Sequence, residues 1–150
     1  MDEFSSFVFE YNECSVSIHE EISRQFLQEW NDFTDKNDVH EWILNIIKNN
    51  GQIYVMVDKN NNELMGTVGI QYNEKHIDVL LVSTAYRHHG YGKLLLRFAE
   101  NQLKKKNASD VSLYCYDHLC DFYMNLGWQM TGTMTRLDNG LLAHVLHKKM

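Results

Sequence analysis

The sequence predicts an α/β fold with one mixed sheet, predominantly antiparallel around a central parallel pair, and helices on both faces. Three observations predict it. Apolar runs separated by polar turns predict three antiparallel strands between residues 52 and 82. A helical stretch over 90–106 leads to another apolar run at 111–116, and a helical crossover makes the two strands that it joins parallel. Asn139-Gly140 predicts a closing hairpin turn.

The N-terminal third predicts one strand and two helices. Residues 7–11 alternate weakly between apolar and polar side chains, as in an outer strand. Between 17 and 33 apolar residues recur every three or four positions and predict a helix; its apolar stripe comprises Ile18, Ile22, Phe26, Trp30 and Phe33. After a break at 31–36, a second helix is expected from about Asp38, a suitable N-cap, to the stop at Asn50-Gly51.

The middle of the chain predicts the meander and the crossover helix. Strands are expected at 52–57 and 64–72, around a polar turn. The next strand begins near His76 and ends in the apolar run 79–82, as expected of a strand buried on both faces. The following helix begins at Gly90 and is expected to turn these side chains inward: Leu94, Leu95, Phe98 and Leu103.

The C-terminal part predicts a strand, a short helix and a hairpin. The strand covers 111–116, and Asp117 can cap a helix from His118 to Leu126 that Gly127 terminates. Two further strands, 128–136 and 141–148, flank the hairpin turn. No linker interrupts the pattern, so a single domain over residues 1–150 is expected.

Composition excludes several classes of function. The chain has 150 residues and a net charge of −6, with a pI near 5.7, which argues against nucleic acid as a partner. No signal peptide or membrane span is expected. The three cysteines form no C-x-x-C motif, which favours reduced thiols and a cytoplasmic location. The histidines show no spacing typical of metal ligands, so no metal site is expected.

A glycine-containing loop separates the fourth strand from the helix. Arg87-His88-His89-Gly90-Tyr91-Gly92 directly precedes the helix, whose first N–H groups have no partners within it. Such a turn can bind an anion, and two glycines let a phosphate approach the backbone. An ordinary turn explains the same residues. A dinucleotide fingerprint is excluded by the missing third glycine, and a P-loop by the missing Gly-Lys-Ser/Thr.

A second segment, Phe122-Tyr123-x-x-Leu126-Gly127-Trp128, lies downstream on the short helix. Together with Arg87-x-x-Gly90-x-Gly92 it resembles the GNAT superfamily of acetyl-CoA-dependent N-acyltransferases. The resemblance covers residues from about 51 to 149 well and the N-terminal third loosely. It implies a GNAT-like fold in which the fourth and fifth strands splay apart at their C-terminal ends and admit the pantetheine arm of the acetyl-CoA co-substrate.

The resemblance also implies which residues bind the co-substrate. Pantetheine is expected at the backbone of the fourth strand and the pyrophosphate at the glycine loop. The expected binding residues are Leu81, Val82, Ser83, Arg87, His88, His89, Gly90, Tyr91, Gly92 and Lys93.

The catalytic residues implied by the resemblance are Tyr123, His76 and Asp78. Tyr123 occupies the position of the family's general acid and can protonate the leaving thiolate; packing in a core helix is the alternative. His76 falls where histone-acetylating members carry a glutamate base, and an imidazole can relay the proton. Asp78 lies on the same strand face if no bulge intervenes. Solvent-facing strand residues are the alternative for both. A backbone N–H near Val82 is expected to polarise the thioester carbonyl.

The acceptor is expected to be a primary amine of a small molecule or a peptide. The protein itself is expected to be a monomer or a homodimer. Three aspartates crowd the connection between the first two helices and could attract a cationic amine, although a solvated loop explains them too: Asp32, Asp35 and Asp38. A non-catalytic acyl-CoA sensor or interaction module on the same fold is the alternative function. A nucleotide-phosphate enzyme is disfavoured because metal-binding carboxylates are absent.

Overall fold

The computed structural model describes residues 7–30 and 32–150. The strands are β1 (Val8–Glu10), β2 (Gly51–Asp58), β3 (Glu63–Gln71), β4 (His76–Val82), β5 (Asp110–Cys115), β6 (Gln129–Arg136) and β7 (Leu142–Lys149). The α-helices are α1 (Val16–Glu29), α2 (Lys36–Lys48), α3 (Tyr91–Lys105) and α4 (Cys120–Met124). Short 3₁₀ turns occur at Tyr11–Glu13, Thr84–Tyr86 and Asp117–Leu119.

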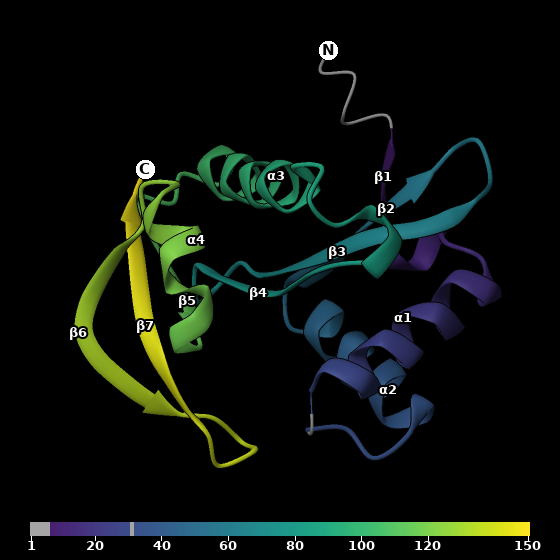
Figure 1. Cartoon of the computed structure of the whole chain (residues 1–150), viewed down its shortest axis with the longest axis horizontal. Helices are drawn as coiled ribbons and strands as arrows, with labels where there is room; N and C mark the ends of the chain where they lie inside the picture. The colour runs from purple at the N-terminus through teal and green to yellow at the C-terminus, as the bar shows by residue number, and fades with distance from the viewer. Residues whose placement is uncertain (1–6, 31) are drawn as a thin grey trace.

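The strands form one sheet in the order β1-β2-β3-β4-β5-β7-β6, with β4 and β5 parallel and the other neighbours antiparallel. α1 and α2 cover one face of its first half, and α3 covers the other face (Figure 1). Each face therefore has its own hydrophobic core. The predicted α/β fold, with its mixed and mostly antiparallel sheet, is confirmed.

α1 shows why the first helix begins and ends where it does. The Ser15 side chain accepts a hydrogen bond from Ile18 N at 3.3 Å and caps the N-terminus. The helix ends at Glu29, so the prediction that it continues to Phe33 is wrong. Trp30 adopts an extended backbone, and the rings of Trp30 and Phe33 instead pack on Phe26 at centroid distances of 5.0 and 6.1 Å. The aromatic spacing of the sequence thus reflects core packing, which continues past the helix.

α2 begins two residues earlier than predicted. Its N-cap is Asp35, whose side chain accepts from Asp38 N at 2.9 Å, so the expectation that Asp38 is the cap is wrong. Asp38 lies in the first turn, where its Oδ2 accepts from Thr34 N at 2.9 Å. Of the predicted interruption at 31–36, Asn31 lies outside the described residues.

A β-bulge interrupts β4 just after its first three residues. Thr67 of β3 pairs with Leu81, but Gly69 pairs with Asp78, so β4 carries one extra residue. Val79 at the bulge has φ +44°, and its carbonyl accepts from Thr67 Oγ1 at 3.0 Å. The register of β4 before the bulge is regular.

The two parallel strands touch at one end only. Within the described residues, His76↔Ser112 is the single register pair between β4 and β5. β4 runs six residues beyond it, about 20 Å at the usual rise per residue. The strands therefore separate toward their C-terminal ends, as the resemblance implied.

α3 and α4 differ in detail from the prediction. Leu95 and Leu103 of α3 are buried as predicted, but Leu94 is 40% exposed and Leu96 takes the inward position. α4 begins at Cys120 without a side-chain cap; Asp117 opens the preceding 3₁₀ turn, and its carboxylate contacts His144 instead. The predicted cap and the predicted start at His118 are therefore wrong.

Within the described part of the chain, no helix combines the length and the apolar character needed to cross a bilayer.

Candidate active site

The glycine loop presents free backbone donors at the start of α3. Gly90 is the N-cap of this helix in the left-handed conformation, with φ +85°, which favours glycine. The first main-chain bond of the helix is Leu94 N to Gly90 O at 3.2 Å. The amides of Tyr91, Gly92 and Lys93 therefore lack helical acceptors and face outward at the positive end of the helix dipole.

Side chains of the loop surround these donors. Arg87, His88, His89 and Lys93 are exposed, and His88 has φ +67°. The Tyr91 ring packs against the Tyr86 ring, with centroids 6.2 Å apart. The loop thus combines backbone N–H groups with cationic side chains, which is the donor set that a pyrophosphate requires.

At the end of β4, Val82 is the residue whose backbone faces the gap. Leu81 is paired with β3, and Ser83 N donates to Met65 O of β3 at 2.8 Å. Because hydrogen-bonding direction alternates along a strand, the peptide groups of Leu80 and Val82 point away from β3, toward β5. The Val82 carbonyl accepts from Arg87 Nε at 2.9 Å.

The side chains of Leu81 and Ser83 point away from this gap. Leu81 packs in the core beneath α1 and α2. Ser83 Oγ donates to Leu64 O at 2.8 Å and accepts from Gln25 Nε2 at 2.9 Å. Of the three expected pantetheine residues, Val82 therefore has a free N–H group at the edge of the strand, whereas Leu81 and Ser83 hold β4 in place.

The two sequence segments behind the resemblance meet in space. A Cβ added to Gly92 would lie 3.5 Å from Phe122 Cζ and 3.6 Å from Val82 Cγ2. The first turn of α3, the end of β4 and α4 thus converge around Gly92. A side chain larger than a methyl group at this position would displace Phe122.

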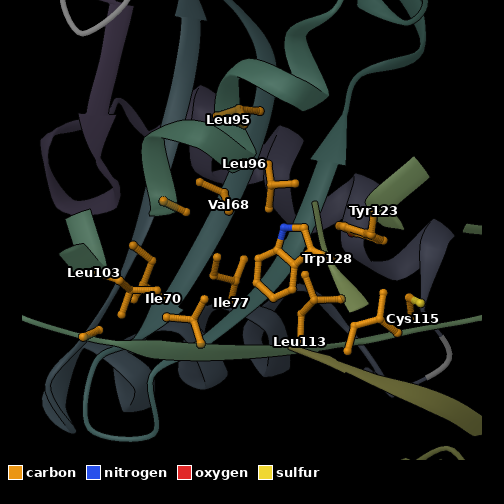
Figure 2. Packing of buried hydrophobic residues seen from close by; sticks show 14 of the residues in the cluster. Val68, Ile70, Ile77, Leu95, Leu96, Leu103, Leu113, Cys115, Tyr123 and Trp128 are labelled. Carbon is orange, nitrogen blue, oxygen red and sulfur yellow. The ribbon is translucent and has the colours of Figure 1, made fainter. Parts of the chain in front are cut away.

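Tyr123 lies on α4 with its ring in the core on the α3 side of the sheet. The ring packs edge-on against Phe122 at 5.1 Å and against Trp128 at 6.5 Å between centroids. Figure 2 shows it beside Trp128, Leu113 and Cys115. Within residues 7–30 and 32–150 its hydroxyl has no hydrogen-bond partner, although it is not fully shielded from solvent. Such a group is available to a ligand.

Burial is the largest cause that raises the pKa of Tyr123 above its ordinary value, and nearby acidic groups, Asp78 among them, raise it further. The phenol therefore stays protonated at neutral pH. The neighbouring Phe122 lies beside Gly92 and Val82 at the C-terminal end of β4, and Cys115, the last residue of β5, belongs to the same core cluster as Tyr123. Tyr123 is thus on the C-terminal side of the gap between the two strands.

His76 and Asp78 share one face of β4, because their register with β3 is regular and the bulge follows Asp78. His76 is buried, its Nδ1 lies 2.9 Å from Ser112 Oγ, and its ring packs on Tyr114 at 4.4 Å between centroids. Burial lowers the pKa of His76, opposed by the charges of Asp78 and Glu74. The imidazole is therefore neutral at physiological pH.

Asp78 is the ionisable side chain of the pair closer to the opened gap. Burial raises its pKa, the His76 charge and the bond from Val79 N at 2.9 Å oppose this, and Asp32 raises it further. Gln71 Nε2 donates to Asp78 Oδ2 at 3.4 Å. A carboxylate with a raised pKa is a stronger base than an exposed one.

Of the three aspartates between the first two helices, Asp32 is the one whose charge influences Asp78. Asp35 and Asp38 are engaged in the N-terminal cap of α2. Asp35 and Asp38 therefore have a structural role at the start of α2.

Two features near the site were not found from the sequence. Gln71 and Ser112 bond to Asp78 and His76, but each looks like an ordinary strand residue, and only the register brings them there. Cys115 and Cys120 approach to 2.9 Å between sulfurs, and burial raises the pKa of Cys115 to about 12, so this thiol stays protonated.

A polar hollow of about 510 Å³ lies on the α1 side of the glycine loop. Its lining includes Glu21, Arg24, Glu63 and Arg87, but not Tyr123, His76 or Asp78. The candidate reaction centre is therefore separate from this hollow.

Known acetyltransferases share this fold. The sequence model of the acetyltransferase (GNAT) domain matches residues 18–150. An aminoglycoside 6′-N-acetyltransferase crystallised with coenzyme A has a TM-score of 0.76 and 16% identity, covering 95% of this chain and 96% of that chain. The aminoglycoside 6′-N-acetyltransferase from Enterococcus faecium has a TM-score of 0.72 and 17% identity, covering 95% and 96%.

An acetyltransferase of the GNAT family from Staphylococcus aureus has a TM-score of 0.65 and 19% identity, covering 95% of this chain and 97% of that chain. The chain belongs to the GNAT acetyltransferase family. It is an N-acetyltransferase, and its acyl donor is acetyl-CoA.

Proposed function

We propose that the protein transfers an acetyl group from acetyl-CoA to a primary amine of a cationic acceptor, by direct attack while both substrates are bound. One observation carries the proposal. The strands β4 and β5 pair only at His76 and Ser112 among the described residues, and we assign the unpartnered phenol of Tyr123 and the carboxylate of Asp78 to the gap beyond this pair, as proton donor and proton acceptor. Two opposed proton transfers are what acyl transfer from a thioester to an amine requires.

The glycine loop supplies the binding site for the donor's diphosphate. The free amides of Tyr91, Gly92 and Lys93 and the side chain of Arg87 form a compact set of donors in a protein of net charge −6. We assign the pantetheine arm to the open edge of β4. Here the N–H groups of Leu80 and Val82 can also polarise the thioester carbonyl, since preorganised backbone donors stabilise developing negative charge. The bound donor supplies an activated acetyl group.

Tyr123 is assigned as the proton donor to the leaving sulfur. Burial keeps the proton on its oxygen, and the absence of another partner among the described residues leaves the hydroxyl free to turn to the sulfur. A thiol has an ordinary pKa of about 8.5, below that of a phenol, so the hydroxyl first stabilises the developing thiolate by a hydrogen bond, and the phenolate that proton transfer leaves is reprotonated from solvent.

Asp78 is assigned as the proton acceptor and His76 as its neighbour in the relay. A free alkylammonium has a pKa of about 10.4, so a base or a desolvating site must help to remove its proton. Asp78 has the raised pKa and the shorter path to the gap, whereas Nδ1 of His76 is engaged by Ser112. Neutral His76 can pass the proton onward.

A cationic acceptor follows from the charges at this end of the site. Asp32 and Asp78 both present carboxylates, and two negative charges in a partly dry site attract an ammonium group. Two neighbours with this fold are named aminoglycoside 6′-N-acetyltransferases, which supports the same class. The three free cysteines are consistent with action in the reducing cytoplasm.

The alternative function is a non-catalytic acyl-CoA sensor on the same fold. It needs the glycine loop, but it does not need an unpartnered phenol at the gap. The unpartnered phenol of Tyr123 therefore favours the enzyme.

The proposal is tested by release of free coenzyme A from acetyl-CoA across a panel of amines: polyamines, aminoglycosides, lysine peptides and neutral amines. Amine-dependent thiol release is expected, with cationic amines with two or more ammonium groups turned over best. Binding of acetyl-CoA by calorimetry without turnover on any amine would favour the sensor and overturn the proposal.

A further inference from the structure

Glu100 is a buried carboxylate in the middle of α3, with 4% of its surface exposed. Two donors from distant parts of the chain bind it. Trp128 Nε1 donates to Oε2 at 3.2 Å, and Lys148 Nζ donates to Oε1 at 2.8 Å. Because a buried carboxylate without partners is costly, these contacts hold α3, the start of β6 and β7 together. None of the three residues belongs to the expected acyl-transfer site.

Both donors also hold the turn that follows Tyr123. Lys148 Nζ donates to Leu126 O at 2.9 Å. Leu126 N and Trp128 N both donate to Tyr123 O, at 3.0 and 3.1 Å. The carbonyl of Tyr123 therefore sits inside a turn that is tied to Glu100 through Lys148 on one side and through the Trp128 indole on the other.

The Lys148 side chain can pack against this turn because residue 127 is a glycine. It has φ +95°, and a Cβ at this position would lie 3.3 Å from Lys148 Cε and 3.4 Å from Nζ. Leu126, Gly127 and Trp128 thus supply a carbonyl for the ammonium, a position without a Cβ and an indole N–H for the carboxylate.

We propose that Glu100 is a positioning residue: through Lys148 and Trp128 it fixes the turn after α4 and thereby holds the Tyr123 hydroxyl at the gap between β4 and β5. The inference rests on the proposed role of Tyr123 as proton donor. α4 has five residues and cannot maintain its own position, since helices of this length are unstable alone. A small displacement of a reacting group is enough to slow catalysis strongly.

The test substitutes Glu100→Gln. The glutamine side chain has the same size as glutamate, but an NH₂ group replaces one of the two carboxylate oxygens. That NH₂ group then faces a donor, either Trp128 Nε1 or Lys148 Nζ, which loses its acceptor. We expect kcat to fall about tenfold, while KM for acetyl-CoA changes less than about twofold, because the glycine loop is untouched. Hydrogen exchange at the amides of Leu126 and Trp128 is expected to accelerate, since local stability of the turn is lost.

Two controls separate positioning from general destabilisation. Arg97→Gln removes the second ion pair of Glu100, the one with Arg97. The Arg97 side chain is 43% exposed and makes no hydrogen bond to the backbone of the turn in the described residues. Tyr72→Phe removes a half-buried hydroxyl contact to Tyr54, 2.6 Å long, in a part of the sheet remote from α4. Both are expected to leave kcat and the two exchange rates within about twofold of the unmodified protein.

A double-mutant cycle with Tyr123→Phe completes the test. If Glu100 acts through the Tyr123 hydroxyl, Glu100→Gln has no further effect on the residual turnover of the Tyr123→Phe protein. An equal loss in both backgrounds, or an unchanged kcat in Glu100→Gln alone, overturns the inference. Full turnover of Tyr123→Phe alone overturns the proposed acid instead. In that case the exchange rates still decide whether Glu100 holds the turn.

Discussion

The imidazole of His76 and the hydroxyl of Ser112 meet at 2.9 Å, at the one register pair that joins β4 to β5 in the described chain. This contact closes the N-terminal end of the gap whose other end faces Tyr123. The same histidine is buried beside Asp78, so a structural bond and a candidate proton relay share one residue.

Ser112→Ala is expected to destabilise the protein by about 1 kcal/mol, because it leaves Nδ1 of a buried His76 without its partner. The measurement is the free energy of unfolding by urea. Ser109→Ala, at an exposed serine just before β5, is the control and is expected to change stability little. Equal stability of the two variants would show that the His76–Ser112 contact contributes nothing.

His76 is expected to make stability depend on pH. Burial lowers its pKa in the folded protein, so the unfolded chain binds more protons as the pH falls below about 6.5. The contribution of His76 to stability is therefore complete at higher pH and is lost as the pH falls toward the folded-state pKa. Urea midpoints at several pH values should decline less on acidification for His76→Gln than for the unmodified protein. Parallel declines would contradict the assignment.

Asp78→Asn is expected to lower kcat/KM by about 10²-fold, since an amide cannot accept the proton. The acid limb of the pH profile should also disappear. Burial raises the pKa of Asp78, so in the unmodified enzyme this limb lies above the pH at which an exposed carboxylate titrates, and activity rises with pH through it. Asp138→Asn, in the exposed hairpin turn, should retain the limb. A limb that persists in Asp78→Asn assigns the base elsewhere.

Gly90→Val is expected to abolish binding of coenzyme A, measured by calorimetry, because a β-branched residue is strained at φ +85° and distorts the free amides of the loop. Gly132→Val is the matched control. Gly132 has φ +82° in β6, with nothing within 4 Å of an added Cβ, so the strain is similar but the site is distant. Loss of binding in both variants would assign the effect to instability rather than to the loop.

The fold was predictable because local signals agree with tertiary packing over most of the chain. The meander, the crossover helix and the closing hairpin follow from apolar runs and turn residues that each act over a few positions. The errors lie where tertiary contacts decide. Phe33 continues the spacing of α1 but packs from the following loop, and Asp117 could cap α4 but contacts His144 across the sheet. A local sequence pattern cannot predict these contacts, because it does not show which distant residue each side chain meets.

The candidate site was predictable only in part, for the same reason. The glycine loop and the segment after Phe122 are local motifs, and the sequence places both. The bulge at Val79 and the bond between His76 and Ser112 depend on strand register. The bond joins residues 36 positions apart and leaves no trace in the spacing of either partner.

The proposed mechanism requires that the amides at the start of α3 hold the co-substrate with its sulfur within reach of the Tyr123 hydroxyl. The most direct measurement is kcat of Tyr123→Phe with the best amine of the panel, together with its affinity for coenzyme A. We expect kcat to fall by about 10²-fold or more with an unchanged affinity, because the ring still packs and only the hydroxyl with its proton is removed. Full turnover in this variant would contradict it.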